Sequence, residues 1–112
     1  MPGKARWNMY QVIFWNESKG WDPTYRCLEV WEQDHKLTRH DHNMIINAMF
    51  EYACEEGILA NRLTAILRNM EHPSKMYRYD LRTNEQHNEY GSGIYSDLYI
   101  NNKFVRRMVV AE

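Results

Sequence analysis

Alternating and uniformly apolar stretches predict several β-strands along this chain. Asn8–Trp15 is rich in aromatic and β-branched residues on both faces, which is typical of a central or covered strand. After a turn-rich stretch, Tyr25–Glu32 is the second predicted strand, joined to the first as an antiparallel hairpin. In Tyr77–Arg82, apolar and charged residues alternate, so we expect a third strand with one buried face. The polar residues 83–93 are predicted to form a mobile loop.

The last strands, Ile94–Ile100 and Lys103–Val110, are predicted to form a hairpin around Asn101-Asn102. Asparagine tolerates the positive φ that a type I′ turn requires at both of its central positions. A regular register then predicts three cross-strand pairs, which are Leu98–Val105, Ile94–Val109 and Asp97–Arg106.

Helical spacing appears in the middle of the chain. Thr38 and Asp41 are both suitable N-cap residues, and Gly57 is a suitable left-handed residue after the last turn. The apolar residues between them recur at helical intervals and are Ile45, Ala48, Met49 and Tyr52. A second, shorter helix is predicted from Asn61, with the apolar stripe Leu63, Ile66, Leu67 and Met70. One bent helix is the alternative.

Together these elements predict an α+β fold in the order ββ-α(α)-βββ. We expect an antiparallel sheet of about five strands, with one bent helix or two short helices packed on one face. The length of 112 residues fits a single domain spanning residues 1–112. Hydrophobic residues make up 44% of the chain and charged residues 26%, as in ordinary globular proteins.

Charge and apolar runs limit the partners. The net charge of −1 argues against strong non-specific attraction to nucleic acid or acidic lipid. No apolar run approaches the length of a membrane span, and the first residues lack the apolar stretch of a secretory signal. We therefore expect a cytoplasmic protein without a membrane partner.

One face of the predicted C-terminal hairpin is unusually aromatic. Its opposite face carries Ile94, Leu98, Ile100, Val105 and Val109 and is predicted to be core. An exposed sheet face is normally polar, and aromatic, Met and Arg side chains are enriched at protein interfaces. The sequence therefore predicts binding to a protein partner, or self-association into a homodimer. The predicted contact residues are Trp21, Tyr95, Tyr99, Phe104, Arg106 and Met108.

Other interpretations of the aromatic face remain open. The N-terminal segment around Trp7 covers it in one of them. In another, the aromatic rings stack on the bases of a single-stranded nucleic acid. A weak helix–turn–helix at Ala53–Ile58 is a further route to nucleic acid, although Glu56 occupies a position that is usually apolar. The basic residues assigned to nucleic-acid binding are Arg62, Arg68, Arg78, Arg82 and Arg107.

The segment around residue 38 is rich in potential metal ligands. His35, His40 and His42 lie among aspartates, a set that suits Zn, Fe or Mn in a metal-dependent hydrolase. The alternative is a solvated loop in which Thr38 or Asp41 caps the helix.

No other sequence pattern predicts a catalytic site or a cofactor site. Cys27 and Cys54 form no CxxC pair, and we predict that both are buried free thiols. Phosphate-binding, nucleophile-elbow and HExxH motifs do not occur, and no cofactor is predicted. The leading hypothesis is a small non-enzymatic interaction protein, of the kind found among viral accessory and inhibitor proteins.

Overall fold

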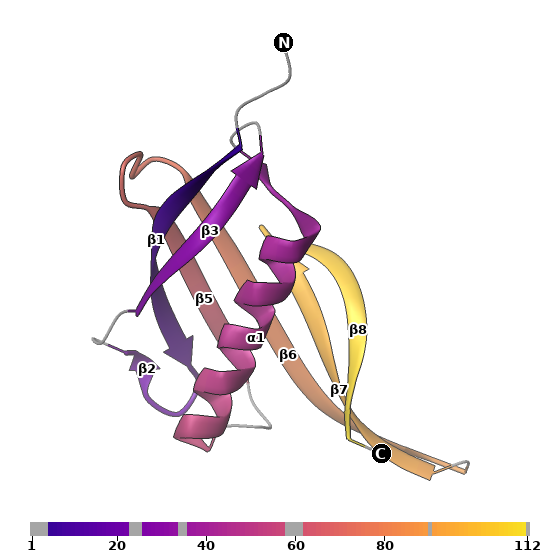
Figure 1. Cartoon of the computed structure of the whole chain (residues 1–112). Helices are drawn as coiled ribbons and strands as arrows, with labels where there is room; N and C mark the ends of the chain where they lie inside the picture. The colour runs from indigo at the N-terminus through magenta and orange to yellow at the C-terminus, as the bar shows by residue number, and fades with distance from the viewer. Residues whose placement is uncertain (1–4, 23–25, 34–35, 58–61, 90, 112) are drawn as a thin grey trace.

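One antiparallel sheet and one helix make up the described part of the chain (Figure 1). The computed structural model describes residues 5–22, 26–33, 36–57, 62–89 and 91–111. The elements are β1 (Ala5–Asn16), β2 (Gly20–Trp21), β3 (Arg26–Gln33), β4 (Lys36–Leu37), α1 (Arg39–Glu56), β5 (Arg62–Asn69), β6 (Met76–Asn88), β7 (Gly91–Ile100) and β8 (Lys103–Ala111). The predicted α+β class with an antiparallel sheet is confirmed, and the strands exceed the expected number of about five.

The strand order is β4-β3-β1-β5-β6-β7-β8, and β2 pairs with the end of β1. Every pairing is antiparallel. The predicted hairpin between the first two long strands is confirmed, because β1 pairs with β3 from Ala5 to Val12. Since β1 lies inside the sheet, the N-terminal strand does not cover the aromatic face, and that interpretation is wrong. Residues 1–4 lie outside the described residues.

Both ends of α1 are defined by the residues that the sequence singled out. Thr38 is the N-cap, and its hydroxyl accepts a hydrogen bond from the Asp41 backbone amide. The buried Asp41 carboxylate accepts in turn from the Thr38 amide at 2.7 Å, which completes a capping box. Gly57 ends the helix with a left-handed φ of 68°.

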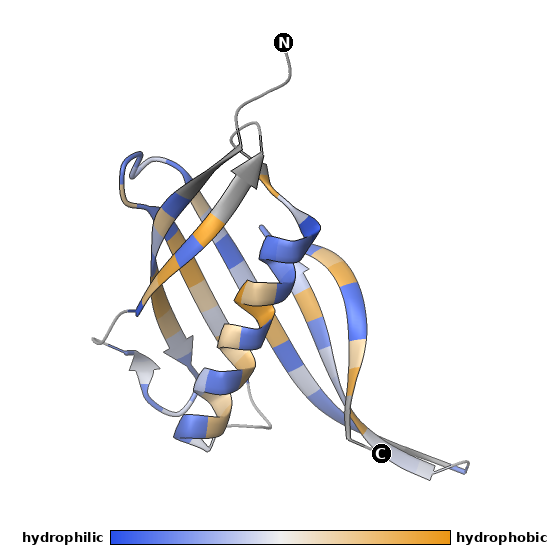
Figure 2. Cartoon of the chain, in the orientation of Figure 1, coloured by the Kyte–Doolittle hydropathy of each residue, from blue (hydrophilic) through white to orange (hydrophobic). Residues whose placement is uncertain are grey.

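The hydrophobic core lies between α1 and the face of the sheet that it crosses (Figures 1 and 2). Ile45, Met49 and Tyr52 are buried on the helix, as predicted. The ring of Tyr52 stacks on Phe14 of β1, with 4.2 Å between the centroids. The Tyr52 hydroxyl donates to Asp22 and accepts from the buried Asn16 side chain, so the end of α1 is tied to the β1–β2 turn.

The predicted second helix is wrong, because Arg62–Asn69 forms the central strand β5. Leu63, Ala65 and Leu67 alternate toward α1 and are buried, while Thr64 and Ile66 lie on the opposite face. The same apolar residues satisfy helical and strand spacing, and the strand gains backbone hydrogen bonds on both sides. The single bent helix is excluded for the same reason.

The predicted loop at residues 83–93 is also wrong. β6 continues to Asn88 and pairs with β7 from Gly91 onward, so the two strands form one long hairpin. Its Arg82–Asn88 part is mostly hydrophilic (Figure 2). Pairing of backbone groups therefore extends a strand through a polar sequence that lacks an apolar alternation.

The β7–β8 turn is as predicted, but the register beyond it is not. Asn101 and Asn102 have φ values of 51° and 67°, which fit a type I′ turn. A β-bulge between Leu98 and Tyr99 then shifts the pairing by one residue. The observed partners are Leu98–Arg106, Asp97–Arg107 and Tyr95–Val109 in place of the predicted pairs. Val105 and Val109, predicted as core, are 47% and 57% exposed.

Two further observations concern the cysteines and the helix. Cys27 and Cys54 are free, as predicted, but both are exposed rather than buried. The only described helix is too polar to qualify as a membrane-crossing segment.

Candidate binding face on the open side of the sheet

The face of the sheet opposite α1 carries no helix or strand in the described residues (Figure 1). We call it the open face. Because paired residues point to the same side, the registers assign its side chains. Leu63 of β5 and Leu81 of β6 pair with each other and are buried toward α1. Their chain neighbours Arg62, Thr64, Asp80 and Arg82 therefore lie on the open face.

One cross-strand row of the open face is mostly aromatic. Successive register pairs join Trp21 to Trp15, Trp15 to Thr64, Thr64 to Asp80, Asp80 to Tyr99 and Tyr99 to Phe104. The row crosses the sheet from β2 to β8. The rings of Tyr99 and Phe104 meet edge to face, with 5.7 Å between their centroids.

A second row, about 7 Å along the strands, is mostly cationic. It joins Arg62 to Arg82, Arg82 to Asp97 and Asp97 to Arg107. Like charges directly opposite each other on neighbouring strands repel. Within the described residues no ion pair neutralises Arg62, and Arg82 shares Asp97 with Arg107. The Arg62–Arg82 pair is therefore a place where an anion is electrostatically favoured.

Two carboxylates on the open face hold Arg78 and Arg107 in place. Asp80, buried at 6% exposure, accepts hydrogen bonds from Thr64 at 2.5 Å and from Arg78 Nε at 2.9 Å. Asp97 accepts from Nε and a terminal nitrogen of Arg107 at 2.8 and 3.1 Å. This bidentate contact lowers the pKa of the Asp97 carboxyl below its usual value.

Arg82 is placed by an aromatic ring. Its guanidinium carbon lies 4.2 Å from the centroid of Tyr99, which is a close cation–π contact. Arg82 is therefore positioned before any ligand arrives, which reduces the entropy lost on binding.

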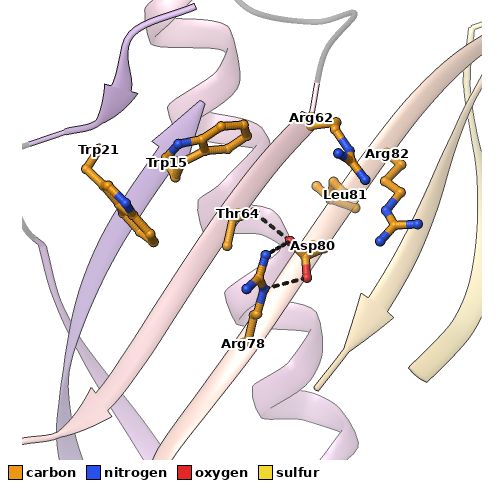
Figure 3. A pocket seen from close by; sticks show the side chains of 8 residues that line it. All are labelled: Trp15, Trp21, Arg62, Thr64, Arg78, Asp80, Leu81 and Arg82. Carbon is orange, nitrogen blue, oxygen red and sulfur yellow. Dashed lines mark hydrogen bonds and ion pairs between the residues drawn. The ribbon is translucent and has the colours of Figure 1, made fainter. Parts of the chain in front are cut away.

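The two rows enclose a pocket of about 260 Å³ (Figure 3). Trp15 and Trp21 line one side, and Arg62 and Arg82 lie toward the other. The hydrogen-bonded Thr64, Asp80 and Arg78 lie between them. The tryptophan rings thus lie on one side of the pocket and the guanidinium groups of Arg62 and Arg82 on the other. This arrangement suits a ligand that has a flat apolar part and a negatively charged group.

The same face carries exposed apolar side chains, most of them outside the pocket. They are 42–58% exposed and are Met9, Trp21, Met76, Phe104 and Val109. Ile13 and Ile66 lie between them and are half-buried. The open face therefore combines aromatic, Met and Arg side chains, which are the residue types enriched in protein interfaces.

Most of the predicted contact residues lie on this face. It brings together Trp21, Tyr95, Tyr99 and Phe104, whereas the bulge sends Arg106 and Met108 to the side of α1. There Arg106 donates to Asn43 of α1 at 3.3 Å, and Met108 packs against the core. All the arginines assigned to the nucleic-acid alternative also lie on the open face, and they are Arg62, Arg68, Arg78, Arg82 and Arg107.

Sequence reasoning missed Trp15, Thr64 and Asp80 as members of the site. The alternation of Arg78, Asp80 and Arg82 on the wet side of β6 was the available signal. Thr64 and its strand were hidden by the helical spacing of their apolar neighbours. Recognising β5 as a strand is what places Thr64 beside Asp80 and opposite Trp15.

The predicted helix–turn–helix is wrong. Gly57 does end a helix, but Arg62–Asn69 is a strand within the sheet rather than a recognition helix. Arg62 and Arg68 therefore cannot enter a major groove on a helix.

The histidine-rich segment is not drawn together in the described residues. His35 lies outside them, His40 is exposed, and His42 is half-buried against the sheet. His42 Nδ1 and the Tyr79 hydroxyl are joined by a hydrogen bond. In the part of the chain that the structure describes, no three potential metal-ligating side chains cluster.

The environment of His42 predicts a pH dependence of stability. Burial lowers the pKa of His42 below its ordinary value of 6.5, so the folded chain binds a proton less readily than the unfolded chain. The free energy of unfolding therefore falls as the pH drops below about 6.5, by at most about 1.4 kcal/mol per pH unit from this group. We expect the free energy of unfolding, measured with urea between pH 7 and 5, to change less with pH in His42→Gln than in the wild type. His40→Gln is the control because His40 is exposed on the same helix. An equal pH dependence of the unfolding free energy in the two variants would contradict the role assigned to His42.

Comparison of the chain with protein-family models, curated proteins and solved structures finds no match.

Proposed function

We propose that this chain is a non-enzymatic binding protein whose open face docks an acidic segment of another protein. The observation that carries the proposal is the pair Arg62–Arg82, opposed across β5 and β6 beside Trp15 and Trp21. An aspartate or glutamate of a partner relieves the repulsion between the two guanidinium groups. An adjacent apolar side chain of the same partner fills the space beside the tryptophans.

The composition of the face favours a protein over a nucleic acid. Among the side chains described on it, the cations are all arginines, and Met9 and Met76 are exposed beside them. Arginine and methionine are enriched in protein interfaces, whereas lysine is depleted. Asp80 and Asp97 lie between the arginines and interrupt the continuous cationic track that a phosphate backbone requires, whereas a single carboxylate needs only the Arg62–Arg82 pair. The net charge of −1 also gives little long-range attraction to nucleic acid.

The arginine pair provides a direct test. Immobilised wild-type protein is used to capture partners from a nuclease-treated lysate of the native host, and the captured protein is titrated against the purified chain. The double variant Arg62→Ala/Arg82→Ala is expected to bind it about tenfold more weakly, because two charge-assisted contacts are lost. The control Lys75→Ala/Lys103→Ala removes the same charge at the ends of two hairpins and is expected to bind like the wild type.

Three outcomes oppose the proposal. Equal affinities of the two double variants would remove the arginine pair from the interface. Capture that disappears on nuclease treatment would favour the nucleic-acid alternative, because the same arginines then contact phosphate. A wild-type dimer that becomes monomeric in Arg62→Ala/Arg82→Ala, measured by light scattering, would assign the face to self-association.

A further inference from the structure

A second concavity lies on the other side of the sheet, between the first half of α1 and strands β7 and β8. Its volume is about 470 Å³, within the range of small-molecule sites. Ile46 of α1 and Leu98 of β7 are almost fully buried at its base. Leu37, Ile100 and Val105 complete an apolar floor. We call this concavity the groove.

The groove exists because α1 is narrower than the sheet. The helix packs against β3, β4 and β5, so the helix side of β7 and β8 extends beyond its edge (Figure 1). The β-bulge shifts the register so that Arg106, rather than Val105, lies opposite Leu98. A cationic side chain is thereby brought to an otherwise apolar surface.

The rim of the groove is cationic. Arg39 and Arg106 are exposed at its border, and Asn43 joins α1 to β8 by accepting the 3.3 Å hydrogen bond from Arg106. No carboxylate lines the groove within the described residues. The nearby Asp41 is buried and engaged by Thr38. The N-terminal end of α1 borders the same rim and adds positive potential.

We propose that the groove binds one molecule of a small amphipathic carboxylate, with its apolar chain on the floor and its carboxylate between Arg39 and Arg106. The apolar floor suits a hydrocarbon chain. The guanidinium groups of Arg39 and Arg106, which form no ion pair with any described residue, suit a negative head group. The concave shape and the small volume fit a single molecule rather than the surface of a bilayer. This site is independent of the open face, which lies on the other side of the sheet.

Decanoate and decanol are suitable probes, since they share a chain and differ in charge. Titration calorimetry below the micelle concentration is expected to show binding of decanoate about tenfold tighter than that of decanol. Arg106→Ala is expected to remove this preference, and Arg106→Lys to restore part of it. Lys75→Ala is the matched control, because it removes one cation at the distant β5–β6 turn, and its preference for decanoate is expected to be unchanged.

The proposal has several ways to fail. Equal affinities for decanoate and decanol in the wild type would remove the role of the arginines. No binding of either probe would show that the floor does not take a hydrocarbon chain. Sedimentation of the protein with anionic phosphatidylglycerol vesicles, lost in Arg106→Ala, would assign the rim to a membrane surface. If the wild type is a dimer in solution and Val105→Glu is a monomer, measured by light scattering, the groove would be assigned to a second copy of the chain.

Discussion

Phe14→Ala is expected to lower the free energy of unfolding by about 3–5 kcal/mol, the range for deleting a buried phenyl ring. The Phe14 side chain is 1% exposed and stacks on Tyr52 of the helix. Its loss leaves a cavity between β1 and α1 and also removes the contact that orients Tyr52. Tyr52 carries the hydroxyl that satisfies the buried Asn16, so the hydrogen bond beneath the β1–β2 turn is weakened as well.

Ile13→Ala is the matched control for this prediction. Ile13 precedes Phe14 in the same strand but lies half-buried on the open face. We expect less than half the loss seen for Phe14→Ala, because less apolar surface is re-exposed and the site opens to solvent. Urea unfolding followed by far-UV circular dichroism measures both values. A larger loss for Ile13→Ala would mean that the faces of β1 are assigned the wrong way round.

The sequence predicts correctly those elements in which the conformational preferences of a few neighbouring residues match the folded structure. Threonine and aspartate three residues apart favour the start of a helix, and glycine favours its end; Thr38, Asp41 and Gly57 bound α1 as expected. Asn101 and Asn102 likewise determine a type I′ turn by their backbone preference alone. In these cases the chemistry that decides the conformation lies within a few residues.

The sequence fails where a distant contact decides between two acceptable local structures. In β5 the apolar residues fit a helix through Leu63, Ile66 and Leu67, and a strand through Leu63, Ala65 and Leu67. Pairing with β1 and β6 selects the strand, and no local signal contains that information. The bulge in β8 is similar, since it is determined by how β8 meets β7 and α1 rather than by turn chemistry.

The same limits apply to the candidate site. The aromatic side of β7 was predictable from alternation, and the alternating charges of β6 were visible. The opposition of Arg62 to Arg82 was not, because Arg62 had been placed on a helix. The site therefore depends on β5, because this strand places Arg62 opposite Arg82 and Thr64 between Trp15 and Asp80.

The open face also separates stability from binding, which permits a second large and selective effect. Trp21→Ala is expected to weaken binding of the captured acidic partner about thirtyfold, equivalent to about 2 kcal/mol of binding free energy. The free energy of unfolding is expected to be nearly unchanged. Trp21 is 56% exposed and belongs to the two-residue strand β2, so it contributes little to the core. It lines the pocket opposite Arg62 and Arg82, where a large aromatic side chain has the greatest value as an anchor.

Met70→Ala provides the control, since Met70 is 54% exposed, follows the last residue of β5 and does not line the pocket. Its affinity for the same partner is expected to equal that of the wild type. The measurement is a titration of the purified partner, with urea unfolding of each variant to establish that the fold is intact. A Trp21→Ala variant that binds as tightly as Met70→Ala would separate the tryptophans from the interface. Partner binding would then rest on the arginine row alone, and its affinity should fall steeply with added salt, because surface charges without a buried apolar anchor are screened within about one Debye length.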